Sequence, residues 1–253
     1  MALLELRALC KNFGGLAAVN NLTLDVQAGS IISLIGPNGA GKSTVFNLIT
    51  GIYAPTGGSI VFEHRTLNGM RPDRVTAAGI ARTFQNIRLF SFMSVLENVM
   101  VGRNARMHAS IADSALRTRR ATREDREVEH RARELLDFFG LTSYGSEWAR
   151  NLPYGMQRRL EIARALASDP RLLLLDEPGA GTNPAEKQAL MRLVQSVRER
   201  GVTVLLIEHD MHLVMGISDA VHVLDYGEQI ACGPPDRVRH DPRVIEAYLG
   251  KGA

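Results

Sequence analysis

A run of glycines followed by a lysine and two hydroxyl residues carries the clearest chemistry in this sequence. It reads Gly36-Pro37-Asn38-Gly39-Ala40-Gly41-Lys42-Ser43-Thr44, fits G-x-x-x-x-G-K-[ST], and stands between an expected strand, 30–35, and an expected helix, 42–50. The glycines let backbone N–H groups turn toward phosphate oxygens, and the helix N-terminus adds a favourable dipole. Lys42 would place its charge at the β- and γ-phosphates, and Ser43 offers an oxygen ligand to Mg²⁺. The segment predicts ATP binding with Mg²⁺, and its flanking elements disfavour a chance glycine-rich turn.

Two adjacent carboxylates supply a second chemical feature. Asp176 and Glu177 follow the continuous apolar run 172–175, which has the character of a strand buried on both faces. Asp176 at the end of such a strand can hold the metal shell, and Glu177 can polarise an attacking water. Carboxylates at strand ends are common in isolation. Together with the phosphate loop they predict a hydrolytic site.

The elements that must position these residues alternate between strand and helix. Apolar runs and turn residues predict strands at 3–7, 22–26, 30–35, 59–62, 80–84, 172–175 and 203–207. Between Ser94, which forms a capping-box pattern with Glu97, and about Phe139 the pattern is helical. Asn183-Pro184-Ala185-Glu186 marks another helix start, and Asp241-Pro242 a last one. We expect an α/β core with an inserted helical subdomain.

Composition limits the function classes. The net charge of +3 over 253 residues does not suggest a nucleic-acid binder, which usually carries a concentrated basic face. Cys10 and Cys232 match no metal or redox spacing and are interpreted as reduced cytosolic thiols. We see no signal peptide, and the longest apolar runs are too short to cross a bilayer. Any work at a membrane would then need a spanning partner.

Three further features decide the family. Gln85 follows a short strand, the segment 152–157 precedes an expected amphipathic helix at 158–167, and His209 follows the strand 203–207. In this order with the phosphate loop and Asp176-Glu177, they resemble the ATPase subunits of ABC transporters across essentially the whole chain. The resemblance implies a P-loop NTPase core of the ABC ATPase type with an N-terminal antiparallel β portion. The core would comprise 1–85 and 152–253, and the helical subdomain 86–151.

The resemblance also implies roles for individual residues. Phe13 would stack on the adenine with Val19 beside it, since a flat aromatic surface suits a base. Gln85 would contact Mg²⁺ and the attacking water while sensing a membrane partner. His209 would hydrogen-bond the γ-phosphate and orient Glu177. A signature segment would act in trans on ATP held by a second ATPase subunit, and here it consists of Pro153, Tyr154, Gly155 and Met156.

Finer matches favour one branch of the family. The stretches 151–164, 207–219 and 241–250 look like one of the two different ATPase subunits of branched-chain amino acid importers, a group that also carries other hydrophobic or amide solutes such as urea. The implied partners are a second ATPase subunit, two membrane-spanning permease subunits and a separate solute receptor. The implied location is the cytoplasmic face of the inner membrane, held there by the permease.

The signature departs from the family pattern Leu-Ser-Gly-Gly-Gln. Pro153 lacks both the serine hydroxyl and a backbone N–H, so the Gly155 N–H and the helix dipole remain to face a phosphate. We therefore hypothesise a heterodimer with two unequal ATP sites. Asn183, where the family often has Asp, puts the usual contact between subunits at that position in doubt.

Several alternatives stay open. A nucleic-acid-associated ABC-type ATPase is disfavoured, because the chain has one phosphate loop and only a short stretch between Gln85 and Leu152. His209 and His212 could form part of a zinc site, although no third ligand is placed. The apolar residues at 89–93 fit either a core or a dock for a transporter helix. The arginine-rich stretch 117–133 has interleaved acids, which favours a solvated helix face over contact with anionic head groups.

Overall fold

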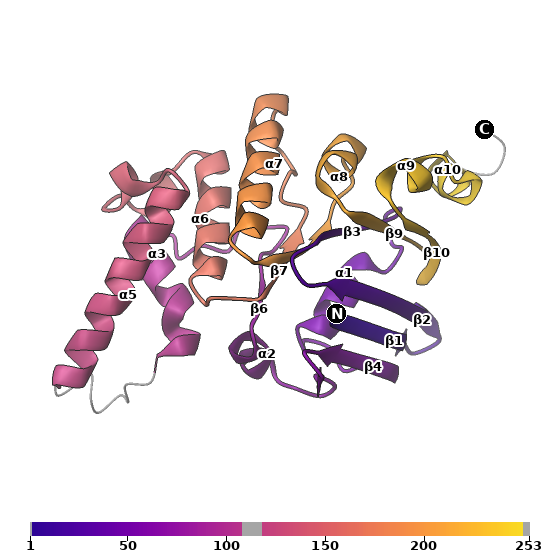
Figure 1. Cartoon of the computed structure of the whole chain (residues 1–253), viewed down its shortest axis with the longest axis horizontal. Helices are drawn as coiled ribbons and strands as arrows, with labels where there is room; N and C mark the ends of the chain where they lie inside the picture. Colours follow the sequence, from indigo (N-terminus) through magenta and orange to yellow (C-terminus); the bar gives the residue numbers. More distant parts are fainter. Residues whose placement is uncertain (1, 108–117, 250–253) are drawn as a thin grey trace. The chain divides into compact units, whose positions relative to one another are not determined.

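The computed structural model describes residues 2–107 and 118–249 (Figure 1). Its contacts divide the chain into two compact units, one formed by Met1–Arg82 with Arg171–Ala253 and the other by Thr83–Pro170. The predicted helical subdomain, 86–151, lies inside the second unit. That unit reaches further along the chain, because a helix beginning at Tyr154 packs against the other helices there.

The first unit contains a four-stranded antiparallel sheet with the strand order β2-β1-β4-β5. Its strands are β1 (Ala2–Phe13), β2 (Leu16–Gln27), β4 (Gly57–Phe62) and β5 (Arg65–Thr66). Gly14, with φ +57°, makes the tight turn between the first two strands. The N-terminal antiparallel β portion expected from the resemblance is confirmed.

The second sheet of this unit has six strands in the order β10-β9-β3-β8-β7-β6. Its strands are β3 (Ile31–Ile35), β6 (Ile80–Arg82), β7 (Leu172–Asp176), β8 (Thr203–Ile207), β9 (Ala220–Asp225) and β10 (Glu228–Gly233). All neighbours run parallel except β9 and β10. Every residue of β3, β7 and β8 is buried, as expected for parallel strands covered on both faces. Their carboxyl ends meet at one edge of the sheet.

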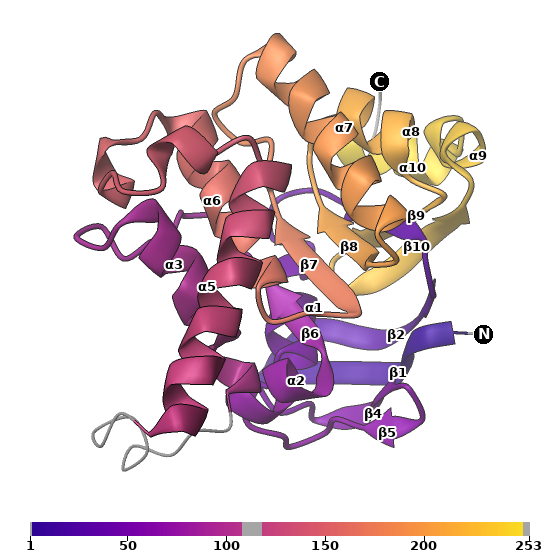
Figure 2. The same cartoon turned by 60° about the vertical axis from the view of Figure 1, so that its left-hand side comes forward.

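Helices cover both faces of the six-stranded sheet. In both cartoon views α7 and α8 lie on one face and α1 on the other, next to the antiparallel sheet (Figures 1 and 2). The helices of this unit are α1 (Lys42–Ile49), α2 (Pro72–Ala78), α7 (Pro184–Glu199), α8 (Met211–Ile217), α9 (Pro235–Arg239) and α10 (Pro242–Leu249). The sequence reasoning did not anticipate α2 or α8, because helices of seven residues show little periodicity.

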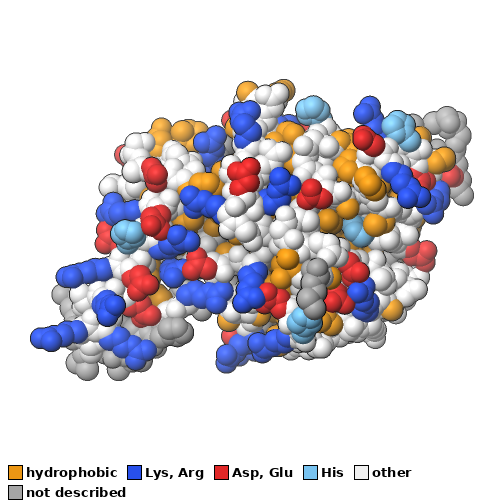
Figure 3. All heavy atoms as spheres, viewed as in Figure 1, with side chains coloured by type: hydrophobic (Ala, Val, Ile, Leu, Met, Phe, Trp, Pro, Cys, Tyr) orange, Lys and Arg blue, Asp and Glu red, His pale blue; other side chains and the backbone are white. Residues whose placement is uncertain are grey.

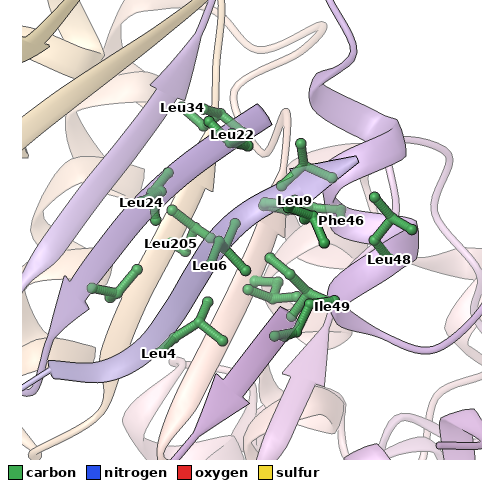
Figure 4. Packing of buried hydrophobic residues seen from close by; sticks show 14 of the residues in the cluster. Leu4, Leu6, Leu9, Leu22, Leu24, Leu34, Phe46, Leu48, Ile49 and Leu205 are labelled. Carbon is green, nitrogen blue, oxygen red and sulfur yellow. The ribbon is translucent and has the colours of Figure 1, made fainter. Parts of the chain in front are cut away.

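The largest core cluster lies between the two sheets, with α1 inside it. Figure 4 shows Leu9 of β1 next to Phe46 of α1, and Leu22 of β2 next to Leu34 of β3, all of them fully buried. Burial of such side chains is the main stabilising term, at about 1.5–3 kcal/mol each. The packing fixes the helix that begins directly after the phosphate loop.

The second unit is helical. Its elements are α3 (Val95–Gly102), the 3₁₀ turns η1 (Arg103–Arg106), η2 (Thr142–Tyr144) and η3 (Ala149–Asn151), and the helices α5 (Arg119–Phe138) and α6 (Tyr154–Leu166). Within the described residues of this unit, α3, α5 and α6 lie side by side (Figure 2). The capping box of Ser94 and Glu97 is confirmed. The predicted start of the helix 158–167 is wrong, because α6 begins at Tyr154 with Pro153 as its N-cap.

The arginine-rich stretch forms the polar face of α5. Arg131 pairs with Glu134 at 2.8 Å, and Arg133 pairs with Glu129 at 2.7 Å, both within one helical turn. Figure 3 shows basic and acidic side chains interleaved where Figure 1 draws this helix. Arg117, the first residue of the stretch, lies outside the described residues. The paired charges are consistent with a solvated face, and contact with head groups stays a hypothesis.

The structure also bears on the expectations for the two cysteines and for membrane-spanning segments. Cys10 and Cys232 are both free thiols. Among the described residues, no helix combines the length and apolar character needed to cross a bilayer.

Candidate functional site

The phosphate loop joins the end of β3 to the start of α1, and its glycines are structurally required. Gly36, Gly39 and Gly41 have φ values of +147°, +84° and +99°, which L side chains rarely adopt. A Cβ on Gly36 would lie 2.0 Å from the carbonyl oxygen of Leu224, and one on Gly41 would lie 2.4 Å from that of Ala18. The loop is therefore held tightly against the backbone of its neighbours. Gly41 is also the N-cap of α1, so the first N–H groups of that helix are available to an anion.

Lys42 lies across the same loop. Its Nζ donates to the carbonyl oxygens of Gly36, at 2.6 Å, and Pro37, at 2.8 Å. Burial lowers the pKa of this lysine, while the charges of Glu177 and Asp176 raise it in part. The loop, the lysine and the two carboxylates thus gather at the carboxyl edge of the six-stranded sheet, as the parallel strands require.

Asp176 ends β7 and is held by an arginine that the sequence reasoning missed. Arg82 Nη2 donates to Asp176 Oδ2 at 2.8 Å, and both side chains are nearly buried. Arg82 Nη1 also donates to Asn47 Oδ1 of α1 at 2.7 Å. The arginine therefore fixes the carboxylate relative to the helix that follows the phosphate loop. No signal in the sequence joins residues so far apart in the chain.

Glu177 sits in a backbone conformation that costs energy. Its φ is +47°, in the left-handed region, and its N–H donates to the Ile207 carbonyl of β8 at 2.9 Å. Strained residues of this kind gather at functional sites, where the surroundings hold them in place. His209 Nδ1 lies 3.8 Å from Glu177 Oε2. The structure therefore brings together two residues whose partnership the sequence predicted from the resemblance alone.

The aromatic feature at the end of β1 differs from the expectation in one respect. Phe13 is 42% exposed, but Val19 is fully buried in the core, so the Val19 side chain offers no surface to a base. The exposed neighbour of Phe13 is Tyr53, whose ring centroid lies 5.2 Å away at an interplanar angle of 78°. Lys11 Nζ lies 5.0 Å from the Phe13 ring. The sequence reasoning missed both residues: only the tertiary fold brings Tyr53 to this ring, whereas Lys11 lies two residues before Phe13 in β1.

The signature residues form the first turn of α6 in the second unit. Pro153 is the N-cap, and the Met156 N–H donates back to its carbonyl at 2.9 Å. The N–H groups of Tyr154 and Gly155 precede the first intrahelical bond and can serve an anion from outside. The segment is thus an anion-facing helix start without a side-chain hydroxyl from Pro153.

Gln85 belongs to the same unit, and its backbone is held by α6. Arg158 donates to the carbonyl oxygens of Phe84 and Gln85, both at 2.8 Å, and to Glu161 Oε2 at 2.9 Å. The Arg158 and Glu161 side chains are only 3% and 1% exposed. A buried ion pair therefore ties the Gln85 segment to the helix that carries the signature. The sequence signal that could have revealed this ion pair is the spacing of three residues between Arg158 and Glu161 in an otherwise apolar helix face.

Asn183 has a clear structural task in this chain. It caps α7 by accepting from the Glu186 N–H at 3.0 Å, and Glu186 returns a bond to the Asn183 N–H at 2.9 Å. The helix start predicted there is confirmed, with a capping box at its first turn. The hypothesis that Asn183 disturbs the family's usual contact between subunits at this position stays a hypothesis.

Two other features border the site. A pocket of about 620 Å³ is lined by Asn38, Tyr226 and Arg243 among others, and by neither Lys42 nor the two carboxylates. Beside it, burial raises the pKa of Tyr248 on α10, and the backbone of Gly36 offsets part of this rise. Within the described residues no three His, Cys, Asp or Glu side chains gather as a metal site, so the zinc alternative at His209 gains no support there.

Comparisons with known proteins agree with this geometry. A family model described as "ABC transporter" matches residues 19–180, and one described as "Branched-chain amino acid ATP-binding cassette transporter" matches residues 228–253. The chain is 46% identical to the high-affinity branched-chain amino acid transport ATP-binding protein LivG of Salmonella typhimurium, covering 98% of each chain.

Two further relatives extend these comparisons. BraF of Pseudomonas aeruginosa, a protein of the same description, is 45% identical over 98% of each chain. Among solved structures, an ATP-binding cassette of an ABC transporter in its ADP conformation superposes with a TM-score of 0.86 at 32% identity, covering 99% of this chain and 100% of that one.

Proposed function

This chain belongs to the family of ABC transporter ATP-binding proteins, and from that membership we propose that it is the ATP-hydrolysing motor subunit of an importer for branched-chain or related hydrophobic amino acids. The observation that carries the solute class is the full-length similarity to LivG and BraF, together with the family match at the C-terminus. An importer for another solute of the group, such as an amide or urea, is the second candidate.

The proposed reaction is in-line attack of water on the γ-phosphate of ATP. Glu177 polarises the water. His209, whose Nδ1 lies 3.8 Å from Glu177 Oε2, contacts the γ-phosphate and orients the Glu177 carboxylate. Lys42 offsets the charge that develops on the transferring phosphoryl group. The exposed face of Phe13, supported by Tyr53, stacks on the adenine.

Mg²⁺ fits the oxygen ligands available at this edge of the sheet. Ser43 is exposed in the first turn of α1, and Asp176 ends the neighbouring strand, so a hydroxyl and a carboxylate of the kind that Mg²⁺ prefers are present. Gln85 would supply a third oxygen. When bound, the ion would neutralise part of the negative charge of the ATP phosphates.

We further propose that the ATP site is shared between two ATPase subunits. The first turn of α6, Pro153–Met156, would face the ATP of a different ATPase subunit, and that subunit's signature would complete the site built on Lys42 and Glu177. Because Pro153 brings no hydroxyl, the site that this chain completes is expected to be the slower of the two. Two permease subunits would hold the pair at the cytoplasmic face of the membrane, and a separate receptor would deliver the solute.

The test uses the whole transporter, assembled from the co-encoded subunits in proteoliposomes. Glu177→Gln is expected to lower ATP hydrolysis by about 10²–10⁴-fold while ATP still binds, because it removes the proton acceptor but not the phosphate loop. Glu199→Gln, an exposed change at the end of α7, is the matched control and should leave hydrolysis unchanged.

Solute identity is read separately, from the uptake of labelled leucine against labelled urea. Leucine uptake driven by ATP supports the proposed solute class, and urea uptake alone would replace it with the second candidate. Binding to nucleic acid in place of co-purification with the permease would contradict the transport function itself. Equal loss of hydrolysis from Glu177→Gln and from the matching change in the partner ATPase would contradict the unequal sites.

A further inference from the structure

Glu208 is a buried carboxylate placed between the two loops that carry the hydrolytic residues. It follows the last residue of β8 and precedes His209, and its side chain is 0% exposed. Burial of a carboxylate is costly unless its oxygens accept hydrogen bonds. The partners of Glu208 therefore indicate what its burial serves.

Three backbone N–H groups from two loops converge on this carboxylate. Oε1 accepts from the Gly179 N–H at 2.6 Å, and Oε2 accepts from the N–H groups of His209, at 3.0 Å, and Asp210, at 3.3 Å. Gly179 lies two residues after Glu177. One side chain thus joins the loop that follows β7 to the loop that follows β8, using one oxygen for each.

The space at Gly179 matches this arrangement. A Cβ built there would lie 2.7 Å from Glu208 Oε1, closer than real Cβ atoms come. Gly179 is not among the residues with positive φ, so the carboxylate rather than the backbone conformation excludes a side chain. The absence of a side chain at Gly179 therefore makes room for the Glu208 carboxylate.

The same carboxylate also faces the imidazole. His209 Nδ1 lies 3.8 Å from Glu208 Oε2 and 3.8 Å from Glu177 Oε2. The imidazole therefore lies next to the carboxylates of both Glu177 and Glu208.

A second link runs parallel to the first. Lys187 of α7 donates to Asp210 Oδ2 at 2.5 Å, and Asp210 Oδ1 caps α8 by accepting from the N–H groups of His212 and Leu213. This link anchors the His209 loop to α7, but it does not reach Gly179. Gly179 is joined to the His209 loop through its hydrogen bond to Glu208.

We propose that Glu208 is a positioning residue for ATP hydrolysis, which clamps the Glu177 loop to the His209 loop so that the two groups keep one geometry. The proposal rests on the proposed ATPase function. In this proposal Glu208 contacts neither the nucleotide nor the attacking water. A loose clamp would misplace the attacking water relative to the γ-phosphate, and small misplacements of reacting groups carry large rate penalties.

Glu208→Gln is the sharpest perturbation, because it keeps the shape and replaces one acceptor oxygen by an NH₂ group that cannot accept. In the assembled transporter, with the partner ATPase subunit made inactive, kcat is expected to fall roughly tenfold or more while the ATP dissociation constant stays within about twofold. Gly179→Ala should reproduce this loss by displacing the carboxylate. Gly15→Ala is its control, since a Cβ there meets nothing within 4 Å.

A double-mutant cycle separates positioning from general damage. If Glu208 acts through His209, Glu208→Gln should cost little further activity in a His209→Ala background. Losses that multiply, or a kcat of Glu208→Gln equal to that of the wild type, would overturn the proposal. Loss of ATP binding with a lowered melting temperature would also overturn it, by showing a purely structural role. A wild-type transporter without ATPase activity would instead count against the proposed function.

Discussion

The buried pair of Arg158 and Glu161 allows the sharpest test of how the second unit is built. Arg158→Met removes donors to two backbone carbonyl oxygens, to Glu161 and to the hydroxyl of Tyr154, at distances of 2.8 to 3.2 Å. It also leaves the Glu161 carboxylate buried without its counter-charge. Breaking a buried pair from one side typically costs about 3–5 kcal/mol, which we expect here as the loss in free energy of unfolding.

The double variant Arg158→Met with Glu161→Leu distinguishes the charge from the clamp. It leaves no buried charge, so its loss should be clearly smaller than the sum of the two single losses. The carbonyl groups of Phe84 and Gln85 nevertheless stay without their arginine donor, and the N–H groups of Phe84 and Arg88 lose their acceptor on Glu161. Amide hydrogen exchange between residues 84 and 88 should therefore remain faster than in the wild type, even where stability is partly restored.

Urea unfolding and hydrogen exchange measure the two effects on the same samples. The matched control is Arg159→Met, the next residue of α6, which is half-buried and should change stability by no more than about 0.5 kcal/mol. A loss below about 1 kcal/mol for Arg158→Met would refute the buried pair. Unchanged exchange at 84–88 would refute the clamp on the Gln85 segment.

Three further predictions follow from the first unit. Gly36→Ala should abolish ATP binding measured by equilibrium titration, because its Cβ would collide with the Leu224 carbonyl, and retained affinity would contradict the loop geometry. Phe13→Ala should weaken binding of ATP by about 1–3 kcal/mol with little change for inorganic triphosphate, and equal weakening of both would exclude base stacking. Burial lowers the pKa of His222, whose ring contacts Gln229. As the pH falls, this histidine is therefore protonated at a higher pH in the unfolded chain than in the folded one. Its contribution to stability is therefore full above the ordinary histidine pKa of 6.5 and declines as pH falls below that value, and His222→Gln should flatten this decline in unfolding measured from pH 7.5 to 5.

Much of the fold could be predicted because its signals are local. The phosphate loop needs glycine conformations within nine residues, and the capping boxes at Ser94 and Asn183 each span four. The strands β3, β7 and β8 are continuous apolar runs because both of their faces are covered. Where a local signal was ambiguous, the predicted helix boundary differs from the observed one. Pro153 reads as a helix breaker, but it caps α6, which therefore begins four residues before the expected start.

The sequence by itself determined which groups could do chemistry and in what order they follow along the chain. The tertiary structure decided which groups hold them. Arg82 reaches Asp176 across 94 residues, Arg158 reaches the Gln85 carbonyl across 73, and Glu208 reaches Gly179 across 29. Spacing in a sequence carries no information about such contacts, because they depend on strand order and helix packing. Val19 was misjudged for the same reason, since only the packed core shows that its side chain is buried.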